Sequence, residues 1–223
     1  MIVASDLEGT LTTGETWRGI RAYLVAHGRS SDFYGFFASQ FPEFLGSKLR
    51  LVPKREFQNR WTARIIRLFS NLPETEFMAV AAWVARNELL PKIRPNVLKL
   101  LQDHQKTGAR VILASGTYQP VLAAVAGEYG FEAIGTPLEV HNGKLTGRVV
   151  GQISVGAEKK HKLEAVLAGQ PLALAYGDTM PDLPMLELAE RAFVVRGKDA
   201  ALEAVAQERG WGLLEALCPV QEQ

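Results

Sequence analysis

The chain has 223 residues, 47% of them hydrophobic, which is enough for one large hydrophobic core or for one core with a modest inserted domain. Lysine and arginine number 25 against 24 for aspartate and glutamate, a net charge of +1. This near-neutral charge gives no reason to expect binding to nucleic acid or to an anionic membrane, so we expect a small-molecule partner. The single cysteine, Cys218, cannot form an internal disulfide, and no apolar run approaches the roughly 18 residues of a membrane span, so we expect a cytoplasmic protein.

A short apolar run at the N-terminus leads directly into acidic residues. Residues 1–4 have the pattern of a buried strand, and Asp6 and Glu8 follow within Asp-Leu-Glu-Gly-Thr. The glycine and threonine allow a sharp turn that can bring both carboxylates to one pocket, although the same residues are also common in ordinary turns. A carboxylate at the end of a strand is a candidate nucleophile for acyl or phosphoryl transfer.

The next part of the chain predicts helices only. Apolar residues recur with helical spacing over 16–26, 32–39, 54–69 and 74–87, with prolines 42, 53 and 73 between or beside these segments. The region is rich in aromatic residues, among them Phe33, Tyr34, Phe36, Phe37, Phe41 and Phe44. We expect most of these to form the core of an inserted helical domain over 15–89, with a main domain made of 1–14 and 90–223.

Strand and helix signals then alternate along the main domain. A helix over 96–106 precedes a buried strand over 110–114, and the strand runs into Ser115, Gly116 and Thr117. These residues predict a helix cap, and the hydroxyl and N–H groups of a helix N-terminus also suit a phosphate. Asn142-Gly143 predicts a small β-hairpin between 138–141 and 144–148.

The C-terminal part continues this alternation. It offers a lysine-rich helix start at 158–162, a strand over 172–176, a helix over 182–190, a strand over 192–195 and a helix over 199–209. Alternating β and α elements predict an α/β fold with a Rossmann-like, doubly wound parallel sheet.

A second acidic group follows the strand over 172–176. Asp178 and Asp182 lie just beyond it, and the carboxyl ends of parallel strands meet at one edge of a sheet. Together with Asp6 they are expected to surround a hard divalent cation, for which Mg²⁺ is the natural choice. Within the lysine-rich run we single out Lys159, because a cation at a helix N-terminus is better explained if an anion faces it; an exposed helix face is the alternative.

Four motifs stand in a recognisable order: Asp6-x-Glu8-Gly9-Thr10, Ser115-Gly116-Thr117, Lys159 and Gly177-Asp178-x-x-x-Asp182. Together they resemble the haloacid dehalogenase (HAD) superfamily. The stretches 113–116, 130–133, 138–147 and 158–163 look like its phosphoserine phosphatase-like branch (subfamily IB), in which a helical cap is inserted after the first motif. The resemblance covers nearly the whole chain.

The resemblance implies a reaction and a role for each matching residue. Asp6 would attack phosphorus and form an aspartyl phosphate, while Glu8 protonates the leaving oxygen and then activates water. Mg²⁺ would be held by Asp6, the backbone carbonyl of Glu8 and Asp178, with Asp182 orienting its waters. The non-bridging oxygens of the phosphate would be held by Ser115, the Gly116 N–H and Lys159.

Glu8 departs from the family, whose phosphatases usually carry Asp at this position. The longer side chain moves the carboxyl group, and a misplacement near 1 Å costs on the order of a hundredfold in rate. Some relatives with phosphotransferase ability also carry Glu here. Transfer of phosphate to an alcohol acceptor therefore stays open, as does a non-catalytic protein that binds a phosphorylated ligand.

The substrate is expected to be a small phosphate ester, with phosphoserine as one candidate. By resemblance, Glu15 would receive a substrate ammonium, and Arg64 is placed to receive a carboxylate, although both also fit ordinary exposed helix charges. Some of the aromatic residues over 33–44 would instead line a pocket for a larger apolar ester or form a homodimer contact. The leading prediction is a Mg²⁺-dependent phosphomonoesterase.

Overall fold

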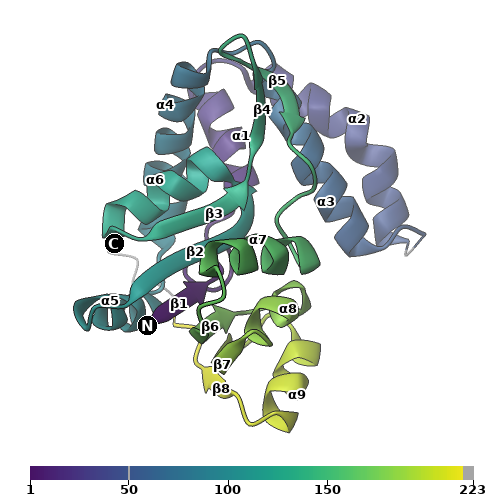
Figure 1. Ribbon diagram of the computed structural model, residues 1–223. Helices are drawn as coiled ribbons and strands as arrows, with labels where there is room; N and C mark the ends of the chain where they lie inside the picture. The colour runs from purple at the N-terminus through teal and green to yellow at the C-terminus, as the bar shows by residue number, and fades with distance from the viewer. Residues whose placement is uncertain (50, 218–223) are drawn as a thin grey trace, which may run out of the picture.

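The computed structural model describes residues 1–49 and 51–217, and Cys218 lies outside this part of the chain. At its centre is a six-stranded sheet with the order β3-β2-β1-β6-β7-β8, in which all neighbouring strands are parallel (Figure 1). The strands are β1 (Ile2–Ser5), β2 (Arg110–Tyr118), β3 (Glu132–Thr136), β6 (Leu172–Gly177), β7 (Ala189–Val195) and β8 (Gly212–Leu214). The strand order reverses beside β1, which places a crevice at the carboxyl ends of β1 and β6.

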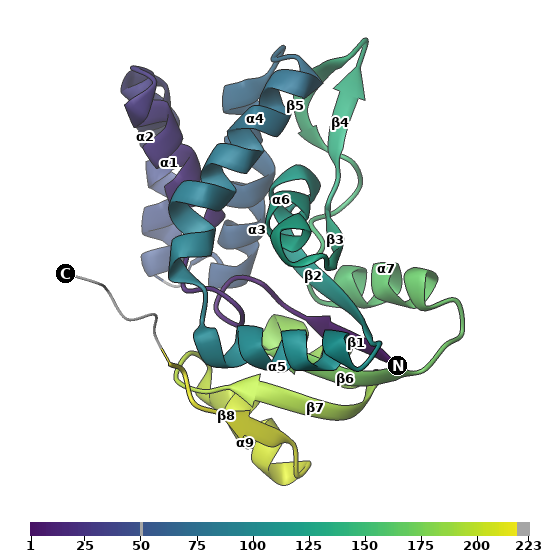
Figure 2. The ribbon, with the colours of Figure 1, turned by 90° about the vertical axis from the view of Figure 1, so that its left-hand side faces the viewer.

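Helices cover both faces of this sheet (Figures 1 and 2). One face packs against α5 (Pro95–Lys106) and α6 (Gln119–Tyr129), and the other against α7 (Ala157–Leu167), α8 (Leu183–Leu186) and α9 (Ala200–Glu208). Alternate residues of each strand enter the two cores; in β2, Leu113 joins the first core and Ile112 the second. Burial on both faces explains the continuous apolar runs of these strands and confirms the predicted doubly wound α/β fold.

The segment between β1 and α5 is helical, as its sequence predicts. It contains α1 (Thr16–Ala26), α2 (Ser30–Lys48), α3 (Lys54–Ile65), α4 (Glu74–Val84) and the short helices η1 (Ile66–Phe69), η2 (Ala85–Leu89) and η3 (Leu90–Lys92). Its buried residues continue the core around α5 and α6 without a break, since Leu24 and Phe77 belong to the same cluster as Val121.

A hairpin of β4 (Leu138–His141) and β5 (Lys144–Val149) extends from the sheet toward these helices (Figure 1). The backbone N–H of Leu145 donates to Leu72, and its carbonyl accepts from Asn71, at 2.9 and 2.8 Å. The hairpin predicted from Asn142-Gly143 is therefore present, and its second strand is hydrogen-bonded to the helical segment.

Several boundaries differ from the predicted ones. α2 continues through Pro42, which is exposed, so the carbonyl that loses its donor stays open to water. Ser115 to Thr117 lie in an irregular end of β2 instead of capping α6, whose N-cap is Tyr118. Glu190 belongs to β7, because the helix predicted over 182–190 ends at Leu186.

Within the described residues, no helix is both long and apolar enough to cross a membrane.

The aromatic residues over 33–44 are less buried than predicted. Only Phe33 is fully buried, with 2% of its surface exposed, whereas Tyr34, Phe37 and Phe41 are among the exposed large hydrophobic residues. The prediction that most of this group forms core is therefore wrong.

Candidate active site

Three aspartates meet at the carboxyl ends of β1 and β6. Asp6 directly follows β1, Asp178 follows β6, and Asp182 ends the short helix η4 (Met180–Asp182). One carboxylate oxygen of each residue lies within 4.8 Å of the others, and all three side chains are buried. The sheet register produces this meeting, because β1 and β6 are neighbours and the Asp6 N–H continues their ladder by donating to the Tyr176 carbonyl at 2.9 Å.

Lys159 neutralises part of this cluster. It lies in the first turn of α7 with 2% of its surface exposed, and its Nζ is 2.6 Å from Oδ1 of Asp6 and 2.6 Å from Oδ1 of Asp182. Burial disfavours its charge, but the two carboxylates outweigh burial and raise its pKa above the ordinary lysine value. Lys159 is thus a fixed cation between two acids.

Asp182 has both carboxylate oxygens engaged by the protein. Its Oδ2 accepts from the backbone N–H groups of Asp178 and Thr179, at 3.1 Å each, while Oδ1 receives Lys159. Burial opposes its charge, but Lys159 and the backbone donors lower its pKa. A Cβ at Gly177 would lie 2.6 Å from Asp182 Cβ, so the glycine is required for this close packing. Asp182 therefore holds Lys159 and the backbone of Asp178 and Thr179 in position.

Asp6 and Asp178 are the two aspartates of the cluster whose charged forms are disfavoured. Burial raises the pKa of Asp6 to about 7; Lys159 opposes this shift, and the neighbouring carboxylates add to it. Burial and then Asp182 raise the pKa of Asp178 as well. Thr10 donates to Oδ1 of Asp178 at 2.9 Å. Its buried Oδ2 has no hydrogen-bond partner among the described residues, although the Lys198 ammonium forms an ion pair with it at 2.9 Å.

Gly9 makes the approach of these groups to β1 possible. Its φ is +101°, and a Cβ there would lie 2.0 Å from Oδ2 of Asp178. Both the backbone conformation and the space require glycine at this point. The Gly-Thr turn that the sequence predicts after Glu8 therefore leaves space for the Asp178 carboxylate beside β1.

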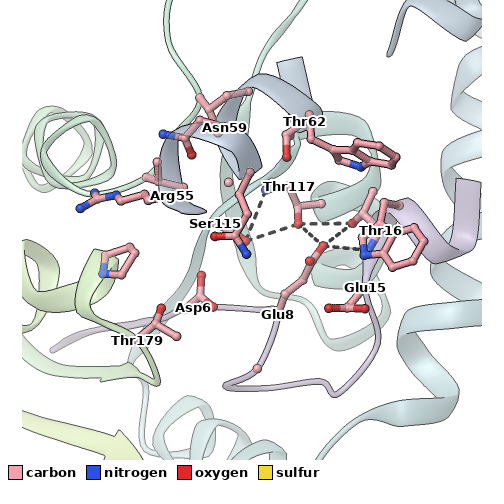
Figure 3. A pocket seen from close by; sticks show the side chains of 18 of the residues that line it. Asp6, Glu8, Glu15, Thr16, Arg55, Asn59, Thr62, Ser115, Thr117 and Thr179 are labelled. Carbon is pink, nitrogen blue, oxygen red and sulfur yellow. Dashed lines mark hydrogen bonds between the residues drawn. The ribbon is translucent and has the colours of Figure 1, made fainter. Parts of the chain in front are cut away.

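The Glu8 carboxylate extends toward Thr16 and Thr117 (Figure 3). Its Oε1 accepts from the Thr16 N–H at 3.0 Å, from the Thr117 hydroxyl at 2.8 Å and from the Thr16 hydroxyl. Thr16 begins α1, so the helix N-terminus also favours this carboxylate. The two threonines hold Glu8 on the wall of the pocket, a role that the sequence predicted for neither of them.

Ser115 lies at the end of β2, across the pocket from Asp6 (Figure 3). Its hydroxyl is 3.4 Å from the N–H and 3.4 Å from the hydroxyl oxygen of Thr117. A Cβ at Gly116 would lie 2.7 Å from Cγ1 of Val155, so glycine lets the end of β2 approach the loop before α7. The Ser-Gly-Thr motif therefore faces the acids and Lys159 even though it does not cap a helix.

Most of these residues, although not Asp178, line a cavity of about 880 Å³ that continues between the sheet and the helices α1, α2 and α3. Glu15 lines it and forms an ion pair with Arg18 at 2.5 Å. Arg64 is not among the lining residues; it forms an ion pair with Glu43 and donates to Gln40 at 2.8 Å. The structure therefore does not place Arg64 toward a substrate carboxylate. The carboxylate of Glu43, on α2, already binds it.

Comparison with known proteins assigns the chain to a family. A family model described as haloacid dehalogenase-like hydrolase matches residues 3–187, a range that contains every motif described above. The chain belongs to this family. Among curated proteins, a phosphoserine phosphatase of Mycobacterium tuberculosis is 33% identical over 217 residues, covering 92% of this chain and 68% of the relative. A histidinol-phosphatase of Neisseria meningitidis is 28% identical over 230 residues, covering 94% and 96%.

Solved structures share the fold of this HAD protein. A protein of unknown function from Bordetella pertussis superposes with a TM-score of 0.78 at 22% identity, covering 96% of this chain and 97% of the other. A probable phosphoserine phosphatase from Vibrio cholerae gives a TM-score of 0.65 at 17% identity, covering 98% and 62%. The family match and the phosphoserine phosphatase-like relatives together identify a HAD phosphatase.

HAD phosphatases generally use a divalent metal, and the residues present fit one. The cluster offers carboxylate oxygens and the Glu8 backbone carbonyl, which are hard ligands suited to such an ion. Among the described residues, the buried Oδ2 of Asp178 has only the half-exposed Lys198 ammonium beside it, and burial, with the neighbouring carboxylates, raises the pKa values of Asp6 and Asp178. A bound dication would relieve both.

Proposed function

We propose that this HAD phosphatase is a Mg²⁺-dependent phosphomonoester hydrolase that acts on a small phosphorylated metabolite through an aspartyl phosphate at Asp6. The observation that supports it most directly is the buried Asp6 carboxylate, held 2.6 Å from Lys159 Nζ at the bottom of a cavity large enough for a substrate. Phosphoserine-like esters are the first candidates, because relatives of this chain are phosphoserine phosphatases.

The proposed reaction has two half-reactions. In the first, a carboxylate oxygen of Asp6 bonds to phosphorus, the ester P–O bond breaks, and the leaving alkoxide takes a proton from Glu8. In the second, water loses a proton to Glu8 and bonds to phosphorus, and the bond to Asp6 breaks to release phosphate. Glu8 thus returns to its starting state after each turnover.

The remaining residues hold the phosphate and the acids in place. The Lys159 ammonium, the Ser115 hydroxyl and the Gly116 N–H would bind non-bridging oxygens, where negative charge increases in the transition state. Asp6, the Glu8 carbonyl and Asp178 would hold Mg²⁺, while Asp182 keeps Lys159 and the loop in position. When bound, Mg²⁺ would reduce repulsion between the phosphate and the attacking carboxylate.

Residues 15–89 are proposed to form a cap over a core made of 1–14 and 90–223. α1, α2 and α3 contribute lining residues to the cavity, so this segment covers the acids and can exclude water from them. Closure around a substrate would then protect the aspartyl phosphate from water until the alcohol has left.

The test is phosphate release from a panel of phosphomonoesters that includes phosphoserine and histidinol phosphate. It is run with Mg²⁺ and with EDTA, on the wild type and on Asp6→Asn. We expect turnover that needs Mg²⁺ and is lost in the variant. Addition of alcohol acceptors distinguishes hydrolysis from phosphotransfer, and turnover retained by Asp6→Asn would contradict the assigned nucleophile.

A further inference from the structure

The upper wall of the cavity is aromatic. Five aromatic side chains line it, from α1, α2 and α3: Trp17, Phe37, Phe44, Phe57 and Trp61. Trp61 is at the centre of the group, with ring centroids at 6.3 Å from Trp17 and 6.0 Å from each of Phe37 and Phe57. The edge-to-face geometry with Trp17, at 88°, fixes the orientation of both indoles. This wall is ordered by its own aromatic contacts.

These rings are not among the buried residues of the hydrophobic core, although Trp17 and Trp61 pack against it. Trp17, Phe44, Phe57 and Trp61 are half-buried, and Phe37 keeps 38% of its surface exposed. The core of the helical segment is formed by other residues, such as Ile20, Phe69 and Phe77, which are almost fully buried. Apolar surface left open inside a cavity loses the benefit of burial unless a ligand covers it.

Two of the charged groups expected to bind a small amino-acid ester already have partners in the protein. Such a substrate needs a cation for its carboxylate and an anion for its ammonium, both a few ångströms from the phosphate. Arg64 is engaged by Glu43, and Glu15 is engaged by Arg18. Arg55 also lines the cavity, where a Cβ at Gly156 would be 2.3 Å from its guanidinium, so a cation is present near the phosphate, but the anion for an ammonium is already paired.

On the basis of the function proposed above, we propose that the substrate is a phosphate monoester whose alcohol carries an aromatic ring or a comparably large apolar group. The phosphate would lie at Asp6 and Lys159, and the apolar group would pack on Trp61 and its neighbours. The two groups belong to different parts of the fold, since Asp6 and Lys159 lie at the sheet and at α7 whereas the aromatic rings lie on α1, α2 and α3.

The test compares 2-phenylethyl phosphate with ethyl phosphate, whose leaving alcohols have similar acidity, and with phosphoserine. We expect kcat/KM for the phenylethyl ester to exceed that for ethyl phosphate by about tenfold, mainly through KM. Trp61→Leu should reduce this ratio toward one. Phe41→Leu is the matched control, because Phe41 is an exposed aromatic of α2 outside the cavity lining, and it should keep the ratio.

Several outcomes separate this inference from the proposed function. Preference for phosphoserine or ethyl phosphate would overturn the inference and leave the hydrolase intact. Absence of turnover on every ester would overturn the function. In that case, tryptophan fluorescence of the Asp6→Asn variant would measure binding of each ester. Tighter binding of the phenylethyl ester than of ethyl phosphate would support the inference, and equal binding would overturn it.

A different observation concerns Lys198, in the turn between β7 and α9. Its Nζ lies 2.9 Å from Oδ2 of Asp178 and 3.2 Å from the backbone oxygen of Glu8. These are two of the ligands proposed for the metal. A Cβ at Gly9 would lie 2.1 Å from the same Nζ, so the ammonium occupies the space that this glycine leaves open. About half of the Lys198 side chain, 51%, remains exposed, so it can move out without disturbing the core.

We propose that the Lys198 ammonium takes the position of the divalent cation in the metal-free protein and leaves it when the ion binds; this rests on the metal site proposed above. One positive charge then always faces Asp178, which would otherwise be a buried carboxylate beside other acids. The lysine stabilises the metal-free form and competes with the ion for the same oxygens.

The test is calorimetric titration of the wild type and of Lys198→Gln with Mg²⁺ alone. We expect Lys198→Gln to bind Mg²⁺ more tightly, by roughly fivefold, and to have a lower thermal midpoint than the wild type in EDTA. Lys160→Gln is the control, since Lys160 is a surface lysine of α7 that pairs with Glu164, and it should change neither quantity. Unchanged or weaker Mg²⁺ binding in Lys198→Gln, or no binding to the wild type, would overturn this proposal.

Discussion

The floor and the upper wall of the cavity are built in different ways. On the floor, buried carboxylates and Lys159 contact one another at 2.6 Å, and nearly every polar atom has a fixed partner. On the upper wall, half-buried aromatic rings contact one another and leave apolar surface open to the cavity. Charged groups in a low-dielectric environment tolerate little displacement, whereas apolar surface accepts many shapes.

This difference separates two tasks. The floor is suited to one chemical step on a phosphate, which all candidate substrates share. The upper wall is suited to selection of the group attached to it. Variants of the floor should therefore change rate or stability strongly, whereas variants of the helical segment should change which ester is preferred.

The largest effect is expected from Asp6→Asn. The substitution is nearly isosteric and leaves Lys159 paired with Asp182, so the fold should persist, while loss of the nucleophile should lower kcat by on the order of 10³-fold or more. Phosphate release and a thermal melt measure the two quantities. Retention of activity would remove Asp6 from the mechanism.

Lys159→Met tests whether the floor depends on charge balance. Methionine fills similar space but leaves three buried aspartates without their central cation. Loss of one partner of a buried ion pair costs about 3–5 kcal/mol, and we expect a destabilisation of that size in urea unfolding with EDTA. A change below about 1 kcal/mol would show that the aspartates simply take up protons at little cost.

Glu8→Asp tests the length of the acid. Because Thr16 and Thr117 bind the Glu8 carboxylate where it now lies, a shorter side chain would lose these contacts or strain the turn. We expect kcat to fall by about tenfold to a hundredfold for hydrolysis. A higher kcat would show that glutamate is misplaced for water activation and would favour phosphotransfer.

Thr117→Val gives a companion measurement on the same acid. It removes one of the hydrogen bonds to Glu8 and keeps the shape of the side chain, so we expect a smaller fall in kcat, of about threefold to tenfold. The fall should appear in kcat more than in KM, because Thr117 holds the reacting acid and not the substrate. A change in thermal midpoint alone, with unchanged kcat, would indicate a purely structural role.

The smallest effect is expected from Arg64→Ala. Since Arg64 pairs with Glu43 outside the cavity lining, kcat/KM for phosphoserine should stay within about twofold of the wild type. Arg55→Ala is the comparison, because Arg55 lines the cavity. A loss of more than tenfold specific to phosphoserine in Arg64→Ala would show that the arginine leaves Glu43 and binds the substrate.

Much of the fold could be read from local patterns. The apolar runs before Asp6 and Asp178 correspond to β1 and β6, and their neighbouring positions in the sheet bring the two carboxylates together. The hairpin at Asn142-Gly143 and the helical segment are also present. The short edge strand β8 was not predicted, since three residues give too few alternations to show a period.

Other features had no local signal. Pro42 predicts a helix boundary, yet α2 passes through it because that position is exposed. Arg64 is the arginine expected to receive a substrate carboxylate, but its partner depends on how α2 packs on α3. Lys198 follows an ordinary strand, and only the strand order places it over Asp178.

The sequence by itself determined the elements and the chemical groups of the floor, because strand periodicity and strand-end position are local properties that one stretch of chain carries. The tertiary structure alone decided which charges meet, that Thr16 and Thr117 hold Glu8, and that aromatic rings of three helices form one wall. These pairings join residues far apart in the chain, and they depend on packing between elements, which no local pattern specifies.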